Sequence, residues 1–378
     1  MVLSPLSARG RCRSTITLSR RVPWLRICLI AGASMSIACS SNAAIANAAR
    51  PETSPSGVVN QSNGEQWSFF VSSEGEVAYW HRSSSKEGWS KHVIGGNVKT
   101  GTSPSALIYK SGEIFVYYVN TKGEIANWTY SEGLWVGRAF GGEVAENSSP
   151  SAATNATNTV QYVTYIDKAG EVADFLLNSK GWFGPSTIGG KVRADTSPTV
   201  TIWENKSAFV YYVNTKGEIA NWTFSPPTEE WVGRAFGGKV AENNSPSAAS
   251  NASGSVMLVS FMNTHEEVDD FLWNGSSWAG PVEIGGEAKA GTNTSTILNK
   301  SAEVLVYYVN KSAEIASWTL SGETWTAATR GGKVEGNTSP SATIYVSKGY
   351  QYIFFMNGSA EVSDFAFEPA EWIGPTVL

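Results

Sequence analysis

Tryptophan recurs at one position of a repeated pattern, and its ring is the most distinctive chemical group in this sequence. The pattern occurs seven times, and each copy places a tryptophan after its last turn. These residues are Trp89, Trp135, Trp182, Trp231, Trp278, Trp325 and Trp372. An indole could stack on the apolar face of a sugar ring, whose C–H bonds meet the negative face of the aromatic system. The alternative is structural: the same rings would fill space between neighbouring repeats.

Carboxylates form a second recurrent set. A glutamate comes before the third β-type run of every copy, and alternate copies add an aspartate inside that run. The glutamates are Glu76, Glu124, Glu171, Glu218, Glu267, Glu314 and Glu361, and the aspartates are Asp174, Asp270 and Asp364. Carboxylates can accept hydrogen bonds from sugar hydroxyls. A glutamate beside a turn in every repeat is also typical of a structural turn partner.

The sequence contains few residues that could support catalysis. The three histidines, His81, His92 and His265, are not spaced as metal ligands, and the three cysteines, Cys12, Cys28 and Cys39, lie near the N-terminus. A His-based metal site or a Ser-His-Asp triad therefore lacks candidates. We predict no catalytic residue, no metal site and no cofactor. A propeller hydrolase or lyase would need one cluster of acids, whereas these motifs are spread evenly.

The charge distribution excludes other classes of partner. The formal net charge is -5, and the first 48 residues contain six arginines and no acidic residue. The rest of the chain is therefore more acidic than the total indicates. Nucleic acids and anionic membranes require a cationic surface, so neither is an expected partner.

The segment VYYVNTKGEIANWT, residues 116–129, returns unchanged at residues 210–223. Looser copies complete a set of seven abutting repeats. Their bounds are 53–101, 102–147, 148–195, 196–243, 244–291, 292–337 and 338–378. A fixed period of this kind is the signature of an array of small supersecondary units. Even repeats carry Tyr-Tyr-Val-Asn, and repeats 3, 5 and 7 carry Asp-Phe, so neighbouring repeats could present two kinds of site.

Each repeat reads as four short strands separated by turns. In repeat 2, a Ser-Pro element precedes apolar residues 105–109, and β-branched and aromatic runs follow at 113–120 and 124–130. This pattern predicts an all-β, seven-bladed β-propeller with four antiparallel strands per blade. A β-solenoid or serial sandwiches are the competing all-β folds. Either the ring closes without a shared blade, or residues 49–53 add an edge.

Residues 1–48 have the pattern of an export signal peptide. Arg20, Arg21 and Arg26 precede an apolar run from Ile27 to Ala38, and Ala46-Asn47-Ala48 offers a cleavage site. The run is too short to anchor the mature chain across a bilayer. We therefore expect a secreted, extracellular protein without membrane insertion. The alternative is a lipoprotein tether through Cys39.

One segment resembles a known family. VDDFLWNGSSW, residues 268–278, is similar to the signature of the fucose-specific β-propeller lectins of fungi and some soil bacteria, and SPSAA (245–249) and VYY (116–118) resemble its blade pattern. In that family an Arg of the second strand, a Glu of the third and Trp side chains hold the sugar between blades. Here the Arg positions hold Trp67, Phe115, Tyr162, Phe209, Leu258, Leu305 and Tyr352. The family commonly has six blades, whereas seven repeats are present here.

The resemblance implies a set of ligand-binding residues, with Asp accepting sugar hydroxyls and Trp stacking. In odd repeats these are Asp174, Trp182, Asp270, Trp273, Trp278, Asp364 and Trp372, and in even repeats Trp128, Trp135, Trp222 and Trp231. Arg138 and Arg234 share one position, and Arg330 falls two places later. They could form ion pairs or clamp a hydroxylated or anionic ligand.

The sequence therefore predicts a non-enzymatic lectin. Its expected partners are glycans, monosaccharide or oligosaccharide, fucosylated ones included, bound at several weak sites between blades. The alternative hypothesis is a propeller scaffold for protein–protein interaction at the cell envelope, without sugar binding. Loss of the family's arginine at every blade favours that alternative.

Overall fold

The computed structural model describes residues 48–84, 87–109, 112–203, 207–226, 228–251, 255–299, 301–368 and 371–378. The expected export segment lies outside these residues except for Ala48, and Cys39 lies outside them as well. No helix occurs in the described ranges, so none there is long and apolar enough to cross a membrane.

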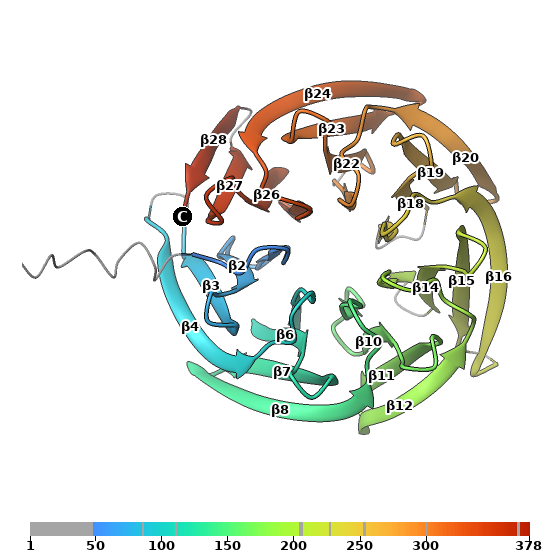
Figure 1. Cartoon of the computed structure of the whole chain (residues 1–378), viewed down its shortest axis with the longest axis horizontal. Helices are drawn as coiled ribbons and strands as arrows, with labels where there is room; N and C mark the ends of the chain where they lie inside the picture. The colour runs from blue at the N-terminus through green and yellow to red at the C-terminus, as the bar shows by residue number, and fades with distance from the viewer. Residues whose placement is uncertain are drawn as a thin grey trace, which may run out of the picture. The chain divides into compact units, whose positions relative to one another are not determined.

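Seven four-stranded antiparallel sheets form the blades of a β-propeller, which confirms the predicted fold class (Figure 1). Within every sheet the strands follow their order in the sequence, so each blade is a meander of consecutive strands. We number the blades 1 to 7 along the chain and call the space between two neighbours a seam, for example seam 4/5.

Blades 1 to 4 contain β1 (Ser56–Val59), β2 (Gln66–Val71), β3 (Glu76–Arg82), β4 (Ser90–Asn97), β5 (Ser105–Tyr109), β6 (Glu113–Val119), β7 (Glu124–Ser131), β8 (Leu134–Glu143), β9 (Ser151–Thr154), β10 (Gln161–Ile166), β11 (Val172–Asn178), β12 (Gly181–Gly189), β13 (Thr199–Trp203), β14 (Ser207–Val213), β15 (Glu218–Ser225) and β16 (Glu230–Lys239). Blades 5 to 7 contain β17 (Ser247–Ser250), β18 (Met257–Met262), β19 (Val268–Trp273), β20 (Trp278–Gly285), β21 (Ser295–Leu298), β22 (Val304–Val309), β23 (Glu314–Ser321), β24 (Thr324–Lys333), β25 (Ser341–Tyr345), β26 (Tyr350–Met356), β27 (Val362–Phe367) and β28 (Trp372–Val377).

Burial follows the position of a strand in its blade. The second strands are almost wholly buried because a blade covers each of their faces, whereas the fourth strands form the exposed outer rim (Figure 1). This explains why the second runs are apolar in almost every position instead of alternating. The apolar core is accordingly divided among the seams, and the cluster at seam 4/5 contains Tyr211, Val259 and Phe271.

The recurrent glutamates are structural. Asn120 accepts hydrogen bonds from the backbone N–H groups of Lys122 and Glu124 at 2.9 and 3.0 Å, and its own amide donates to the Glu124 carboxylate at 3.0 Å. In blade 4, Glu218 forms an ion pair with Lys239 of the fourth strand at 2.8 Å. These contacts hold the turn and the strand pair, as the structural interpretation of these residues predicts.

Paired glycines allow neighbouring blades to approach closely. Gly96 has a φ of +84°, and a Cβ atom there would lie 2.5 Å from the hydroxyl oxygen of Tyr118 in the next blade. The indole N–H of Trp128 donates to the carbonyl of Gly95 at 3.1 Å. The same bond joins Trp222 to Gly189 at 3.0 Å. Glycine is therefore needed here by both backbone conformation and space.

Each Ser-Pro element contributes to a closed circle of hydrogen bonds. In each blade, the residue before the proline donates its backbone N–H to the side chain of the corresponding residue in the next blade. In blade 6 this residue is Asn293, which precedes Thr294 instead of a proline. The seven bonds run through Ser54, Ser103, Ser149, Ser197, Ser245, Asn293 and Ser339 and return to Ser54, at 2.7 to 2.9 Å. Every neighbouring pair of blades is thus joined by the same contact.

The ring closes without a shared blade. Blade 1 takes its four strands from residues 56–97 and blade 7 from residues 341–377. An isolated bridge such as Val98 to Asn120 links each of the other pairs of neighbouring blades, and Ala49 makes the corresponding bridge to Ser72. The Ala49 N–H also donates to the carbonyl of Ala360 at 2.8 Å. Residue 49 therefore makes the contact that joins the last blade to the first.

Candidate functional site

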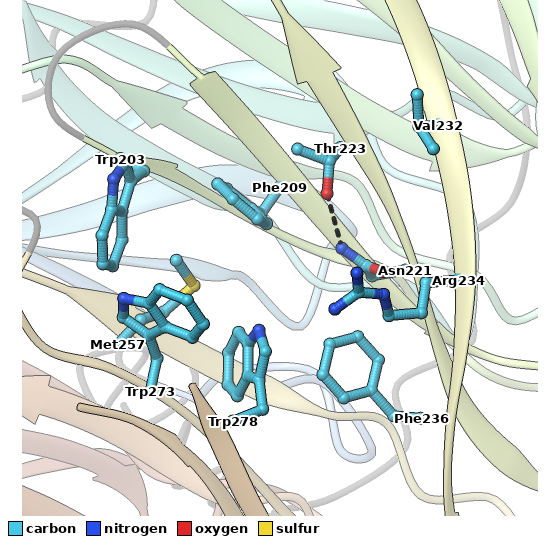
Figure 2. A pocket seen from close by; sticks show the side chains of 10 residues that line it. All are labelled: Trp203, Phe209, Asn221, Thr223, Val232, Arg234, Phe236, Met257, Trp273 and Trp278. Carbon is cyan, nitrogen blue, oxygen red and sulfur yellow. Dashed lines mark hydrogen bonds between the residues drawn. The ribbon is translucent and has the colours of Figure 1, made fainter. Parts of the chain in front are cut away.

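A cavity of about 350 Å³ opens at seam 4/5 (Figure 2). Three indoles line it: Trp203 at the end of β13, Trp273 at the end of β19 and Trp278 at the start of β20. The rings of Trp203 and Trp273 meet edge to face with centroids 5.8 Å apart, and those of Trp273 and Trp278 are also 5.8 Å apart. Both blades therefore contribute an aromatic wall.

Blade 4 supplies the polar groups of the cavity. Residues 221 and 223 share one face of β15 because side chains alternate along a strand. The Asn221 amide donates to the Thr223 hydroxyl at 2.9 Å, and Arg234 lies opposite Asn221 on β16. Asn221 is only 2% exposed, and its carbonyl oxygen has no hydrogen-bond partner. Figure 2 shows the guanidinium of Arg234 directed toward the cavity.

Beneath the cavity lies a contact that differs between related seams. The buried Tyr211 hydroxyl donates to the sulfur of Met257 at 2.8 Å, and burial raises the pKa of Tyr211. At seams 2/3 and 6/7 the corresponding tyrosines, Tyr117 and Tyr307, donate to the amide oxygens of Gln161 and Gln351. Seam 4/5 therefore has a more apolar floor, and Trp203 and Trp273 are additional to its terminal tryptophan.

Comparisons with known proteins bear on the fold. No protein-family model and no curated protein matches the chain. Among solved structures, a lectin from Burkholderia pseudomallei is similar with a TM-score of 0.74 at 13% sequence identity, covering 87% of this chain and 100% of its own. The lectin SapL1, solved with α-methyl fucoside, has a TM-score of 0.57 at 19% identity and covers 73% of this chain and 95% of its own.

A third similar structure is the six-bladed propeller lectin of Aleuria aurantia, described with a fucose recognition mode. Its TM-score is 0.54 at 17% identity, covering 72% of this chain and 93% of its own. The chain has the fold of β-propeller lectins. A six-bladed ring cannot superpose on all seven blades, which is consistent with the partial coverage. The predicted resemblance is therefore confirmed for the fold.

The structure separates the predicted Asp270 from the tryptophans of its motif. Asp270 and Trp273 are three residues apart on β19, so their side chains leave opposite faces of the strand. Trp273 and Trp278 line the cavity at seam 4/5. Asp270 is 3% exposed and faces seam 5/6, where a second cavity of about 330 Å³ is lined by Trp273 as well but not by Asp270.

Asp174 and Asp364 occupy the same position in blades 3 and 7 and are also buried, at 5% and 3% exposure. Burial raises the pKa of Asp174 and of Asp270 to about 7. It raises the pKa of Asp364 to about 6, against the opposing effect of Arg82. None of the three aspartates lines any of the four cavities found at the described residues.

The terminal tryptophans lie one to each seam, half-buried against the preceding blade. Trp135 contacts Phe69 with ring centroids 6.0 Å apart, and Trp231 contacts Tyr162 at 6.1 Å. Trp182 lies 4.7 Å from Phe140, and Trp372 lies beneath the Arg330 guanidinium at 4.4 Å. These rings serve packing, as the structural alternative predicts, and each leaves part of its surface exposed.

Trp128 and Trp222 have a different position, because they hold the glycine carbonyls of the preceding blade. Trp222 also lines a shallow surface pocket at seam 3/4, beside Tyr212. Sequence reasoning did not select Trp203, Phe236 or Met257, all of which line the main cavity. Trp203 could have been selected from the sequence, because it departs from its repeat: the corresponding positions in blades 2 and 6 hold Tyr109 and Asn299.

No group of three or more His, Cys, Asp or Glu side chains that could hold a metal ion was found among the described residues.

Proposed function

We propose that this protein is a carbohydrate-binding lectin whose principal site is the cavity at seam 4/5. The observation that carries the proposal is the juxtaposition of three indoles with the Asn221 carbonyl oxygen and the Arg234 guanidinium. Indoles bind the C–H face of a pyranose, and the two polar groups bind hydroxyls. The fucose ligands of the similar lectins make fucose and related glycans the first candidates.

Several sites of this kind would act together. Seams 2/3 and 6/7 repeat the arrangement of an outer-strand arginine and a terminal tryptophan, with Trp182 and Trp372 in the place of Trp278. Binding at one shallow cavity is expected to be weak, whereas a ring of sites gains affinity on a multivalent glycan surface. We infer binding without bond cleavage.

The decisive experiment measures glycan binding by parent and matched variants. Intrinsic tryptophan fluorescence titrated with α-methyl fucoside, and then with a panel of monosaccharides, should identify a ligand. Trp273→Leu reproduces the residue that blade 3 has at this position, Leu177, so the fold should tolerate it. We expect affinity at seam 4/5 to fall about fivefold, because stacking contributes about 1 kcal/mol beyond burial.

A matched control removes an indole from another seam. Trp325→Leu eliminates a half-buried ring at seam 5/6. Trp325 lines neither the cavity at seam 4/5 nor the second cavity at seam 5/6. It should leave affinity unchanged. Equal effects of Trp273→Leu and Trp325→Leu would contradict the assignment of the cavity.

The scaffold hypothesis has one observation in its favour. Leu134 and Val136 lie two residues apart on the outer strand β8 and are 69% and 64% exposed, and exposed apolar side chains that lie together are a feature of protein contact surfaces. Failure to bind any glycan, together with capture of a defined protein partner that Leu134→Ser and Val136→Ser release, would favour this second function.

We infer that the protein is secreted, on the basis of the arginines and apolar run in residues 1–48. Mass determination of the mature N-terminus tests this. Cleavage after Ala48 agrees with plain secretion, whereas a lipid-modified N-terminal Cys39 identifies a tethered lipoprotein.

A further inference from the structure

One class of seam carries an arginine with no acidic partner. Arg138, Arg234 and Arg330 lie on the fourth strands of blades 2, 4 and 6 and face the next blade. The Arg138 guanidinium lies 4.6 Å from the centroid of Phe140, and that of Arg330 lies 4.4 Å from Trp372. No ion pair found among the described residues involves any of these three arginines. Each seam of this class therefore holds a positive charge beside aromatic rings.

The cavity at seam 4/5 shows the consequence most clearly. None of its ten described lining residues is acidic. The residue paired with Arg234 is Asn221, whereas the same position of blades 3, 5 and 7 holds a buried aspartate. Seam 2/3 repeats this pairing with Asn127 and Arg138, and at seam 6/7 the Arg330 guanidinium donates to the Ser317 hydroxyl at 3.4 Å. Neutral residues thus stand opposite the arginines.

The polar groups of this cavity divide into two kinds. Asn221 presents a buried acceptor without a partner, and a sugar hydroxyl is a suitable donor to it. Arg234 presents only donors, in a planar fork that fits a carboxylate with two parallel hydrogen bonds. A carboxylate would match that charge, whereas a neutral sugar would offer the guanidinium only hydroxyl acceptors in a cavity otherwise lined mainly by aromatic rings (Figure 2).

We propose that the cavity at seam 4/5 prefers an acidic sugar, one whose ring carries a carboxylate, as in uronic and sialic acids. This inference rests on the proposed lectin function and specifies its ligand class. The ring face stacks on an indole, a hydroxyl donates to the Asn221 oxygen, and the carboxylate accepts from Arg234. The chain as a whole is acidic, so attraction of an anion to this cavity depends on a nearby cation such as Arg234.

The test compares each acidic sugar with its own methyl ester, since the two differ in charge and little else. Methyl glycosides of glucuronic, galacturonic and sialic acid, each paired with its ester, and α-methyl fucoside as the neutral sugar, are titrated by calorimetry. We expect one acid to bind on the order of tenfold more tightly than its ester at low ionic strength. Added salt should reduce this ratio, because Arg234 is exposed and its charge is screened.

Two sets of variants assign the preference to the arginines. R138Q/R234Q/R330Q should bring the ratio of acid to ester affinity close to one, because the acid loses its charge-assisted hydrogen bonds and is weakened much more than the ester. K122Q/K180Q/K348Q makes the same change in net charge at exposed lysines outside the seams and should retain the ratio. Loss of the ratio in the lysine set would indicate a nonspecific charge effect and overturn the proposal.

The remaining outcomes separate this inference from the proposed function. Equal binding of acid and ester, or binding of fucoside but of no acid, overturns the acidic-sugar inference and leaves the lectin proposal standing. If no sugar binds, both fall.

Discussion

The buried carboxyl of Asp270 should make the stability of the propeller depend on pH, and substitution by asparagine tests this. Burial, with a smaller contribution from the neighbouring Asp269 carboxyl, raises the pKa of Asp270 from 3.8 to about 7. The fold already accommodates an amide here, because Asn221 has the corresponding position in blade 4. There the amide donates to Thr223, two residues along, whereas blade 5 has Leu272.

The sign of the effect follows from proton binding. The folded state holds the Asp270 proton more tightly than the unfolded chain, so its contribution to stability is fully present below pH 3.8 and is lost as the pH rises through about 7. A pKa difference of this size corresponds to about 4 kcal/mol. The asparagine of the variant cannot ionise, but a buried amide without an acceptor costs about 1–3 kcal/mol at every pH.

Urea unfolding of parent and Asp270→Asn at about pH 4 and about pH 8 measures the difference. We expect the free energy of unfolding of the variant, relative to the parent, to rise by about 4 kcal/mol between these two pH values. The double variant Asp270→Asn/Leu272→Thr also supplies the hydroxyl acceptor that Thr223 provides in blade 4. It should therefore recover the pH-independent loss in the free energy of unfolding. A difference between parent and variant that is the same at both pH values would refute the reasoning.

Three further predictions concern contacts between blades. Gly96→Ala should lower the thermal midpoint much more than Gly123→Ala, because both glycines have positive φ but only Gly96 faces the Tyr118 hydroxyl at close range; equal losses would exclude a steric cause. Tyr117→Phe should cost about 1–2 kcal/mol more than Tyr211→Phe in urea unfolding, since Tyr117 donates to an amide oxygen and Tyr211 to a weakly accepting sulfur. Arg50→Ala should cost about 1–2 kcal/mol by losing the bond to the Val98 carbonyl at 3.0 Å, while Lys122→Ala, at an exposed turn, should not change the midpoint.

The fold could be predicted because its determinants are local and repeated. VYYVNTKGEIANWT combines a buried second strand, an asparagine-centred turn and a third strand, and seven variants of it require seven equivalent blades. Ring closure could not be predicted in the same way. The contact of Ala49 with Ser72 and Ala360 follows the repeat pattern, but it joins the first repeat to the last, and the pattern alone does not show that these two repeats are neighbours.

The candidate site was predicted in part. The terminal tryptophans lie at the seams, as the repeat pattern predicts. The family motif also groups Asp270 with Trp273, but an odd spacing on a strand sends these two side chains to opposite faces. The main cavity depends on Trp203 and Met257, where blade pair 4 and 5 departs from the repeat. A comparison of the repeats picks out the residues that the copies share, so it misses residues that occur in one copy alone.

In the closed circle of backbone-to-side-chain bonds through the Ser-Pro elements, the contact between blades 7 and 1 is the same as the contact between any other two neighbouring blades. Ser339 bonds to Ser54 as every other member of the circle bonds to the next one. The circle therefore does not depend on which connection between blades is covalent. Ala49 and Leu378 also pack in one apolar cluster. A circular permutant that joins these two residues through a short linker and opens the chain between β8 and β9 should therefore rebuild the same propeller, with its origin moved by two blades.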